Sequence, residues 1–330
     1  MNRTQATIRD VAARARVSTA TVSRVVNEDT RVAAATRDRV LAAVEALGYK
    51  MNQVARSLKK GATRTVGLVA PELASDFFML LAESLDRELS IHGYSILVCS
   101  SWETVEEEKK RIKLLSERLV DGIVMIPATD QGRHLRSLQA SGTPLVFIDR
   151  IAKGVAADAV LVDNEGGARE ATLALVADGH RRIGFLGGSL EVSVARERYE
   201  GFTRAMRESG LEVEDAFTRF GSLHVESGFR IMAEMLARPD PPGAYFIVNA
   251  DTHVGATNYL MTEGRERRDG IVFASFDEMP YSPLLQLCRW SVSQPIAEMG
   301  RQAARILLAR MRGEGGSPEL LRLGTTLLRH

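Results

Sequence analysis

Short apolar runs alternate with amphipathic helical stretches over most of the 330-residue chain. The expected strands are residues 66–70, 94–99, 122–126, 145–148, 183–186, 244–248 and 271–276, and helical spacing is clear at 78–91, 105–119 and 166–175. Strands that alternate with helices pair in parallel, with helices on both faces of the sheet. We therefore expect an α/β fold with doubly wound parallel sheets, which bind ligands at the carboxyl ends of their strands.

The charge of the chain is divided unevenly. Residues 1–64 hold 13 Lys and Arg against 5 Asp and Glu, a net charge of +8, while the remaining residues hold 30 against 37, a net charge of −7. A basic end on an acidic body favours an anionic partner at that end, such as nucleic acid or an anionic membrane. A basic surface that only faces solvent would give the same pattern, so charge alone leaves both interpretations open.

Three short helices are expected in the first sixty residues. Thr7 and Asp10 form the pattern of a capping box, Ser18 is placed to cap the second helix, and Gly48 ends the third. Apolar residues recur at helical spacing in each segment: Ile8, Val11, Ala12 and Ala15; Val22, Val25 and Val26; Val40, Val44 and Leu47. Two helices joined by a tight turn and followed by a third indicate a helix-turn-helix unit, although a generic three-helix bundle has the same pattern.

The outer face of the second helix is small and polar. It carries Thr19, Ala20, Ser23, Arg24 and Asn27. Short side chains allow a helix to enter the major groove of DNA deeply. There Thr19 can form hydrogen bonds, the Ala20 methyl can contact a thymine methyl, and Arg24 can bind a guanine through two hydrogen bonds.

These segments resemble the headpiece of the lactose-repressor (LacI/GalR) family. The matching motifs are Ile8-Arg9-Asp10-Val11-Ala12, Val17-Ser18-x-x-Thr21-Val22-Ser23-Arg24-Val25-Val26-Asn27, Thr36-Arg37-x-x-Val40 and Gly48-Tyr49-x-x-Asn52-x-x-Ala55-x-x-Leu58. The match is dense and ordered, and it continues through the rest of the chain. Two positions depart from the family pattern, since Met51 replaces the usual proline before the hinge and Ala33 replaces a helix-capping Ser or Thr.

The resemblance implies a DNA-binding headpiece at residues 1–61, with a hinge helix at about 52–59 that folds in the minor groove of the operator. The implied DNA-binding residues are Thr7, Ser18, Thr19, Ala20, Thr21, Ser23, Arg24, Asn27, Thr36, Tyr49, Asn52, Ala55, Leu58 and Lys59. Leu58 matches the leucine that inserts into the central base step. Asn27, Thr36 and Tyr49 match positions that contact phosphates.

Residues 62–330 are implied to be an effector-binding and dimerisation domain with the two-lobed fold of periplasmic binding proteins. Lobe one covers about 62–161 and 294–322, and lobe two about 162–290. Candidate effector contacts follow the strands or match the family: Phe77, Phe78, Asp149, Arg196, Arg198, Leu223, Asn249 and Asp277. In the family, the residue at Arg198 binds a hydroxyl, ring oxygen or carboxylate of the effector, and the residue at Asp277 accepts from its hydroxyls. Each candidate could instead be a helix cap or an interlobe ion pair. Arg196 beside Arg198 favours an anionic effector.

The resemblance therefore implies a cytoplasmic, homodimeric repressor of carbohydrate-related genes that binds an inverted-repeat operator and is controlled by a sugar, phosphosugar or sugar acid. The alternatives are a stand-alone solute-binding protein and a sugar-active enzyme of the same fold. The sequence has no nucleotide-binding or hydrolase motif, and its six histidines are scattered. We expect no enzymatic activity, no cofactor, no metal and no membrane partner.

Overall fold

A computed structural model describes residues 6–27, 29–49, 62–263, 270–278 and 287–330. The chain divides into two compact units, Met1–Thr63 and Arg64–His330, and each is described by itself. The first unit is called the headpiece and the second the core. None of the helices in the described ranges is long and apolar enough to cross a membrane.

The headpiece consists of the three expected helices, α1 (Ile8–Ala15), α2 (Thr19–Val26) and α3 (Ala34–Leu47). The predicted capping box is confirmed, because the Thr7 side chain accepts from the Asp10 backbone N–H while the Asp10 carboxylate accepts from the Thr7 N–H. Ser18 caps α2, and Ala33 leaves α3 without a side-chain cap. The three helices enclose a small core that includes Val11, Ala12, Ala15, Val22, Val25, Val40 and Ala43.

Lobe one of the core contains a six-stranded sheet in the order β11-β5-β4-β3-β1-β2, in which neighbouring strands are parallel. Its strands are β1 (Thr65–Ala70), β2 (Ser95–Ser100), β3 (Gly122–Met125), β4 (Leu145–Ile148), β5 (Asp158–Val162) and β11 (Leu320–Leu323). Its helices are α5 (Asp76–Ile91), α6 (Val105–Glu117), η1 (Arg133–Leu135), α7 (Arg136–Ala140) and α13 (Ile296–Met311). Two apolar clusters show that α5 and α13 cover one face of this sheet, while α6 and α7 cover the other.

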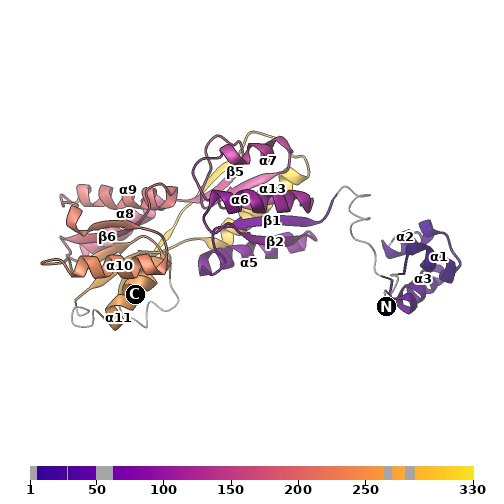
Figure 1. Ribbon diagram of the computed structural model, residues 1–330, viewed down its shortest axis with the longest axis horizontal. Coiled ribbons are helices and arrows are strands. Elements are labelled where there is room, and N and C mark those ends of the chain that lie inside the picture. The colour runs from indigo at the N-terminus through magenta and orange to yellow at the C-terminus, as the bar shows by residue number, and fades with distance from the viewer. Residues whose placement is uncertain (1–5, 28, 50–61, 264–269, 279–286) are drawn as a thin grey trace. The chain divides into compact units, whose positions relative to one another are not determined.

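Lobe two contains a second six-stranded sheet in the order β12-β10-β9-β8-β6-β7. Its strands are β6 (Ile183–Gly188), β7 (Thr218–Gly221), β8 (Ala244–Ile247), β9 (Val272–Phe276), β10 (Cys288–Ser293) and β12 (Thr326–Arg329). Its helices are α8 (Asn164–Ala177), α9 (Ser193–Glu208), η2 (Asp215–Phe217), α10 (Val225–Leu236) and α11 (Ala250–Thr262). Figure 1 shows α8 and α9 on one side of β6 and α10 and α11 on the other, in agreement with the two apolar clusters of this lobe. Among the described strands of this lobe, β12 alone runs antiparallel to its neighbour, β10.

The two lobes are joined by three chain crossings. The chain passes from β5 to α8 at Asp163, from β10 to α13 at Gln294, and from β11 to β12 between Leu323 and Thr326. The sheet residues of both lobes therefore come from separate parts of the chain, and the space between the lobes lies beside the crossings.

The sequence interpretation did not include five of the strands. These are β5, β7, β10, β11 and β12. β11 and β12 lie at sheet edges, where their side chains are exposed or half-buried, so their apolar pattern is weak. The seven strands that were expected are all present, with ends that differ by at most two residues.

Candidate functional site

The outer face of α2 presents side chains to solvent. Thr19, Ala20 and Arg24 are exposed, and the Arg24 guanidinium makes no hydrogen bond or ion pair with another described residue. Asn27 is also exposed, and its side-chain amide donates to the Ser23 carbonyl at 2.6 Å. The face is therefore small, polar and accessible, as a helix that enters a major groove requires.

Other predicted DNA-binding residues have structural contacts of their own. Ser18 Oγ accepts from the Thr21 backbone N–H at 3.1 Å and contacts the Thr21 hydroxyl at 2.9 Å, so both hydroxyls help to begin α2. Thr36 is half-buried, and Tyr49 is half-buried against the headpiece core. The predicted hinge residues Asn52, Ala55, Leu58 and Lys59 lie outside the described residues.

A pocket lies between the two lobes of the core. Seven of the eight predicted effector contacts line it: Phe77, Phe78, Asp149, Arg198, Leu223, Asn249 and Asp277. Phe77 and Phe78 come from the first turn of α5, just after β1, and Asp149, Asn249 and Asp277 follow strands β4, β8 and β9. The structure thus brings together side chains that are up to 200 positions apart in the sequence, because the carboxyl ends of parallel strands meet at one edge of each sheet.

Arg198 is built into the wall of lobe two. Its side chain is 3% exposed, and its guanidinium carbon lies 3.7 Å from the centre of the Phe276 ring. Nε donates to Asn164 Oδ1 at 2.9 Å, and Nη1 donates to the Val248 carbonyl at 2.8 Å. These contacts hold the guanidinium in one orientation at the pocket wall. Burial lowers the pKa of Arg198, and the nearby carboxylates of Asp277 and Asp149 oppose that shift.

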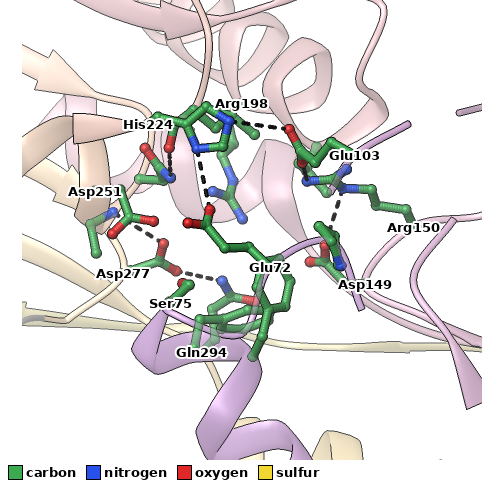
Figure 2. A pocket seen from close by; sticks show the side chains of 17 residues that line it. Glu72, Ser75, Glu103, Asp149, Arg150, Arg198, His224, Asp251, Asp277 and Gln294 are labelled. Atoms are coloured by element: carbon green, nitrogen blue, oxygen red, sulfur yellow. Dashed lines mark hydrogen bonds and ion pairs between the residues drawn. The ribbon is translucent and has the colours of Figure 1, made fainter. Parts of the chain in front are cut away.

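Asp277 and Asp149 face Arg198 from two elements. Asp277 Oδ2 accepts from the Ala250 backbone N–H at 3.3 Å, and Oδ1 accepts from the Gln294 side chain (Figure 2). Asp149 is buried, with a φ of 66°, and its carboxylate lies 3.4 Å from Arg150 Nε. Burial raises the pKa of Asp149, against the lowering effect of Arg150 and Arg198.

Asn249 has a structural contact as well as a place on the pocket wall. Its Oδ1 accepts from the Thr252 backbone N–H at 3.1 Å, which caps α11, and its Nδ2 donates to the Leu223 carbonyl at 2.9 Å. The helix-cap alternative considered for this residue is therefore seen in the structure. The amide also fixes the loop that carries Leu223 into the pocket.

Arg196 lies elsewhere. It lines a second cavity between the lobes, of about 230 Å³, together with Lys153, Ser193 and Glu197. Arg196 donates to Asp130 of lobe one at 2.8 Å and to the Leu190 carbonyl at 2.7 Å. The interlobe ion pair considered as an alternative is therefore the arrangement observed for Arg196, and its guanidinium adds no charge to the first pocket.

The pocket wall also includes charged residues that were not among the predicted effector contacts. These are Glu72, Glu103, Arg150, His224 and Asp251. His224 of lobe two reaches across to lobe one, with Nδ1 at 3.3 Å from Glu72 Oε2 and Nε2 at 3.7 Å from Glu103 Oε2 (Figure 2). A polar residue after a strand was the available signal for Glu103 and Asp251, but the contact between the lobes has no local signature. No cluster of metal-ligating side chains is found among the residues that the structure describes.

Two family models match the chain. The model for bacterial regulatory proteins of the lacI family covers residues 7–52, and the model for periplasmic binding proteins and the sugar-binding domain of the LacI family covers residues 63–327. One curated relative is the HTH-type transcriptional repressor PurR of Mannheimia succiniciproducens, which is 30% identical over 98% of this chain and 97% of its own.

Solved structures of transcriptional regulators are also similar to this chain. A lac repressor dimer bound to operator and the anti-inducer ONPF is 25% identical, with a TM-score of 0.86 over 98% of both chains. The transcriptional regulator CelR in complex with cellobiose is 30% identical, with a TM-score of 0.73 over 98% of both chains. The similarity covers the headpiece and both lobes.

Proposed function

We infer that this chain, which belongs to the lacI family of bacterial regulatory proteins, represses transcription as a dimer that binds operator DNA and responds to a sugar effector. The observation that carries this inference is the combination in one chain of an exposed polar recognition helix and a polar pocket between two lobes. A stand-alone solute-binding protein would have no use for the headpiece.

Base recognition is assigned to the outer face of α2. Thr19, Ala20 and Arg24 would read bases in the major groove, while Asn27, Thr36 and Tyr49 would contact or orient on phosphates. A two-fold dimer requires an operator with two-fold symmetry, so the site is an inverted repeat. Thr7, Ser18, Thr21 and Ser23 would fix the helix ends at the DNA surface.

Arg24→Ala tests this assignment. The exposed guanidinium of Arg24 should contribute about 1–3 kcal/mol at one guanine, so the variant loses operator affinity and tolerates other bases there. Arg39→Ala is the matched control, because it removes an exposed Arg from α3. Operator and random-sequence DNA would be compared by gel retardation. Equal losses on both DNAs for Arg24→Ala would show that Arg24 contacts only phosphate.

The hinge assignment covers Asn52, Ala55, Leu58 and Lys59. We propose that residues 52–59 order on the operator, with Leu58 inserted at the central base step and Lys59 on the backbone. Leu58→Ala should lose most specific binding and keep non-specific binding. Operator affinity equal to wild type would refute the assignment.

The core is proposed to sense its effector by lobe closure. Phe77, Phe78 and Asp149 come from lobe one, whereas Arg198, Leu223, Asn249 and Asp277 come from lobe two, so a ligand that touches both sets would favour the closed arrangement. A ligand shifts such an equilibrium only by its differential affinity for the two states. Asp277→Ala should keep operator binding and lose the response to effector, which is measured as operator affinity with and without ligand.

We propose domain limits of 1–61 for the headpiece and 62–330 for the core, because the first segment would bind DNA and the second would bind the effector. We also propose that the protein acts in the cytoplasm, where its DNA target lies. Fractionation of cells with an antibody against the core tests this location.

A further inference from the structure

The effector pocket has an excess of negative charge. Five carboxylates line it: Glu72, Glu103, Asp149, Asp251 and Asp277. The cationic side chains on its wall are Arg150, Arg198 and, when protonated, His224. With all five carboxylates ionised, the wall carries a net charge of −3 when His224 is neutral and −2 when His224 is protonated. A phosphorylated or acidic effector would add negative charge to this space, which is unfavourable.

The two guanidiniums are already engaged with part of the carboxylate set. Arg150 lies 3.0 Å from Glu103 and 3.4 Å from Asp149. Arg198 is held by Asn164 and Val248, and its charge acts on Asp277 and Asp149. Glu72 and Asp251 are left with His224 as the nearest cationic side chain, and the Asp251 carboxylate accepts no hydrogen bond from another described residue.

The pocket also has an excess of hydrogen-bond acceptors. Gln294 is 9% exposed and donates its amide to Asp277, while its Oε1 is buried and has no partner among the described residues. A buried acceptor without a donor is costly, and a ligand with several N–H groups would satisfy it. Figure 2 shows Gln294, Asp277, Asp251 and Glu72 around the same part of the pocket. The oxygens of these carboxylates and Gln294 Oε1 outnumber the donors described on this side, which include the Ser75 hydroxyl and the Gln294 amide.

The environment of Asp251 also favours a ligand that carries a positive charge. Burial, together with the charges of Glu72 and Asp277, raises the pKa of Asp251 to about 6. A carboxylate in this position is destabilised by its neighbours and is stabilised by a cation placed beside it. Elsewhere in the pocket lining, Arg198 of lobe two is suited to hydroxyl groups, and the aromatic pair Phe77 and Phe78 of lobe one is suited to an apolar sugar face.

We propose that the effector is a polyhydroxylated molecule with a protonated amine, and that Asp251 and Glu72 bind the ammonium group while Arg198 and Asp277 bind hydroxyls. This proposal rests on the proposed function and narrows its effector class. It replaces the expectation of an anionic effector, which depended on Arg196, because Arg196 is paired with Asp130 at the second cavity.

Titration calorimetry on the full-length dimer tests the proposal. The probes are glucosamine, galactosamine and mannosamine, each compared with its parent hexose, which lacks the amine, and with its N-acetyl form, which lacks the charge. Gluconate serves as the acidic probe. At about pH 7.5, where Asp251 is ionised, at least one amino sugar should bind at least about 10-fold more tightly than its parent hexose.

Asp251→Asn should abolish this preference for the amine and change affinity for the parent hexose by less than about 3-fold, a difference below 1 kcal/mol. Glu226→Gln is the matched control, since Glu226 is an exposed carboxylate in the first turn of α10, outside the pocket. Thermal unfolding would verify that both variants fold. Two results would overturn the inference and leave the proposed function intact. The first is that a hexose or gluconate binds at least as tightly as every amino sugar. The second is that Asp251→Asn keeps the preference for the amine. Absence of binding by all the probes would count against both.

Discussion

Arg198 should stabilise lobe two as well as bind effector. The side chain is 3% exposed, it donates to Asn164 and to the Val248 carbonyl, and it packs on Phe276. Arg198→Ala removes both donors and leaves Asn164 Oδ1 and the Val248 carbonyl without those partners. It also takes away the positive charge that faces Asp149 and Asp277.

The size of the loss follows from these contacts. Hydrogen bonds from a charged donor contribute about 1.5–3 kcal/mol each, and removal of one member of a buried charge group costs about 3–5 kcal/mol. Burial disfavours the charge of Arg198 itself, so these contributions do not simply add. We expect the free energy of unfolding of the core to fall by about 3–5 kcal/mol. Operator binding should persist where the variant core remains folded, because the headpiece is a separate compact unit.

Urea unfolding followed by circular dichroism measures this loss. The control is Arg204→Ala on the same helix, because the Arg204 side chain is 57% exposed and forms ion pairs with Glu165 and Glu208. Such surface pairs contribute about 1 kcal/mol or less. A loss for Arg198→Ala no larger than that for Arg204→Ala would refute the view that Arg198 is part of the lobe-two structure.

Two further predictions follow from the ion pairs and buried groups of the core. Asp130→Asn removes the interlobe ion pair with Arg196 and should destabilise the closed arrangement of the lobes by about 0.5–1 kcal/mol. Effector affinity should then fall by about 2–5-fold. Operator affinity in the absence of effector should not change. Equal effector affinity in calorimetry would contradict this. Burial lowers the pKa of His253 in the folded protein to about 3 from an ordinary 6.5. Between these two pH values the unfolded chain binds a proton at His253 that the folded chain does not bind. The free energy of unfolding therefore decreases as the pH falls from about 6.5 toward 3. His253→Leu should therefore be less acid-sensitive than wild type by up to about 1.4 kcal/mol per pH unit in urea unfolding, and parallel pH profiles would contradict this.

The parts of the fold with local signals were predictable. The capping box of Thr7 and Asp10 and the apolar spacing in α1 depend on neighbours within one turn, and the headpiece follows from them. Buried parallel strands such as β4 and β8 are short apolar runs in the sequence and were expected. β11 and β12 were not expected, because each is an edge strand whose partner lies far away along the chain.

The candidate site was predictable to the extent that parallel strands bring their carboxyl ends together. That rule puts Asp149 at the edge of the lobe-one sheet and Asn249 and Asp277 at the edge of the lobe-two sheet, and all three line the pocket. It could not place His224 between Glu72 and Glu103, because this contact depends on how the two lobes face each other. The same limitation explains Arg196, whose neighbour in space is Asp130 of the other lobe and whose neighbour in sequence, Arg198, lies at a different cavity.

The three crossings between the lobes also set the order in which parts of the protein can fold during synthesis on the ribosome. β11 and β12 complete the two sheets, yet they follow all the other described strands along the chain. Neither lobe can finish its sheet until residues 320–329 have left the ribosome. The headpiece needs only contacts within the first unit, and it can fold while the rest of the chain is still being made. In a nascent chain, α2 of the headpiece can therefore form well before the two lobes and the effector pocket between them are complete.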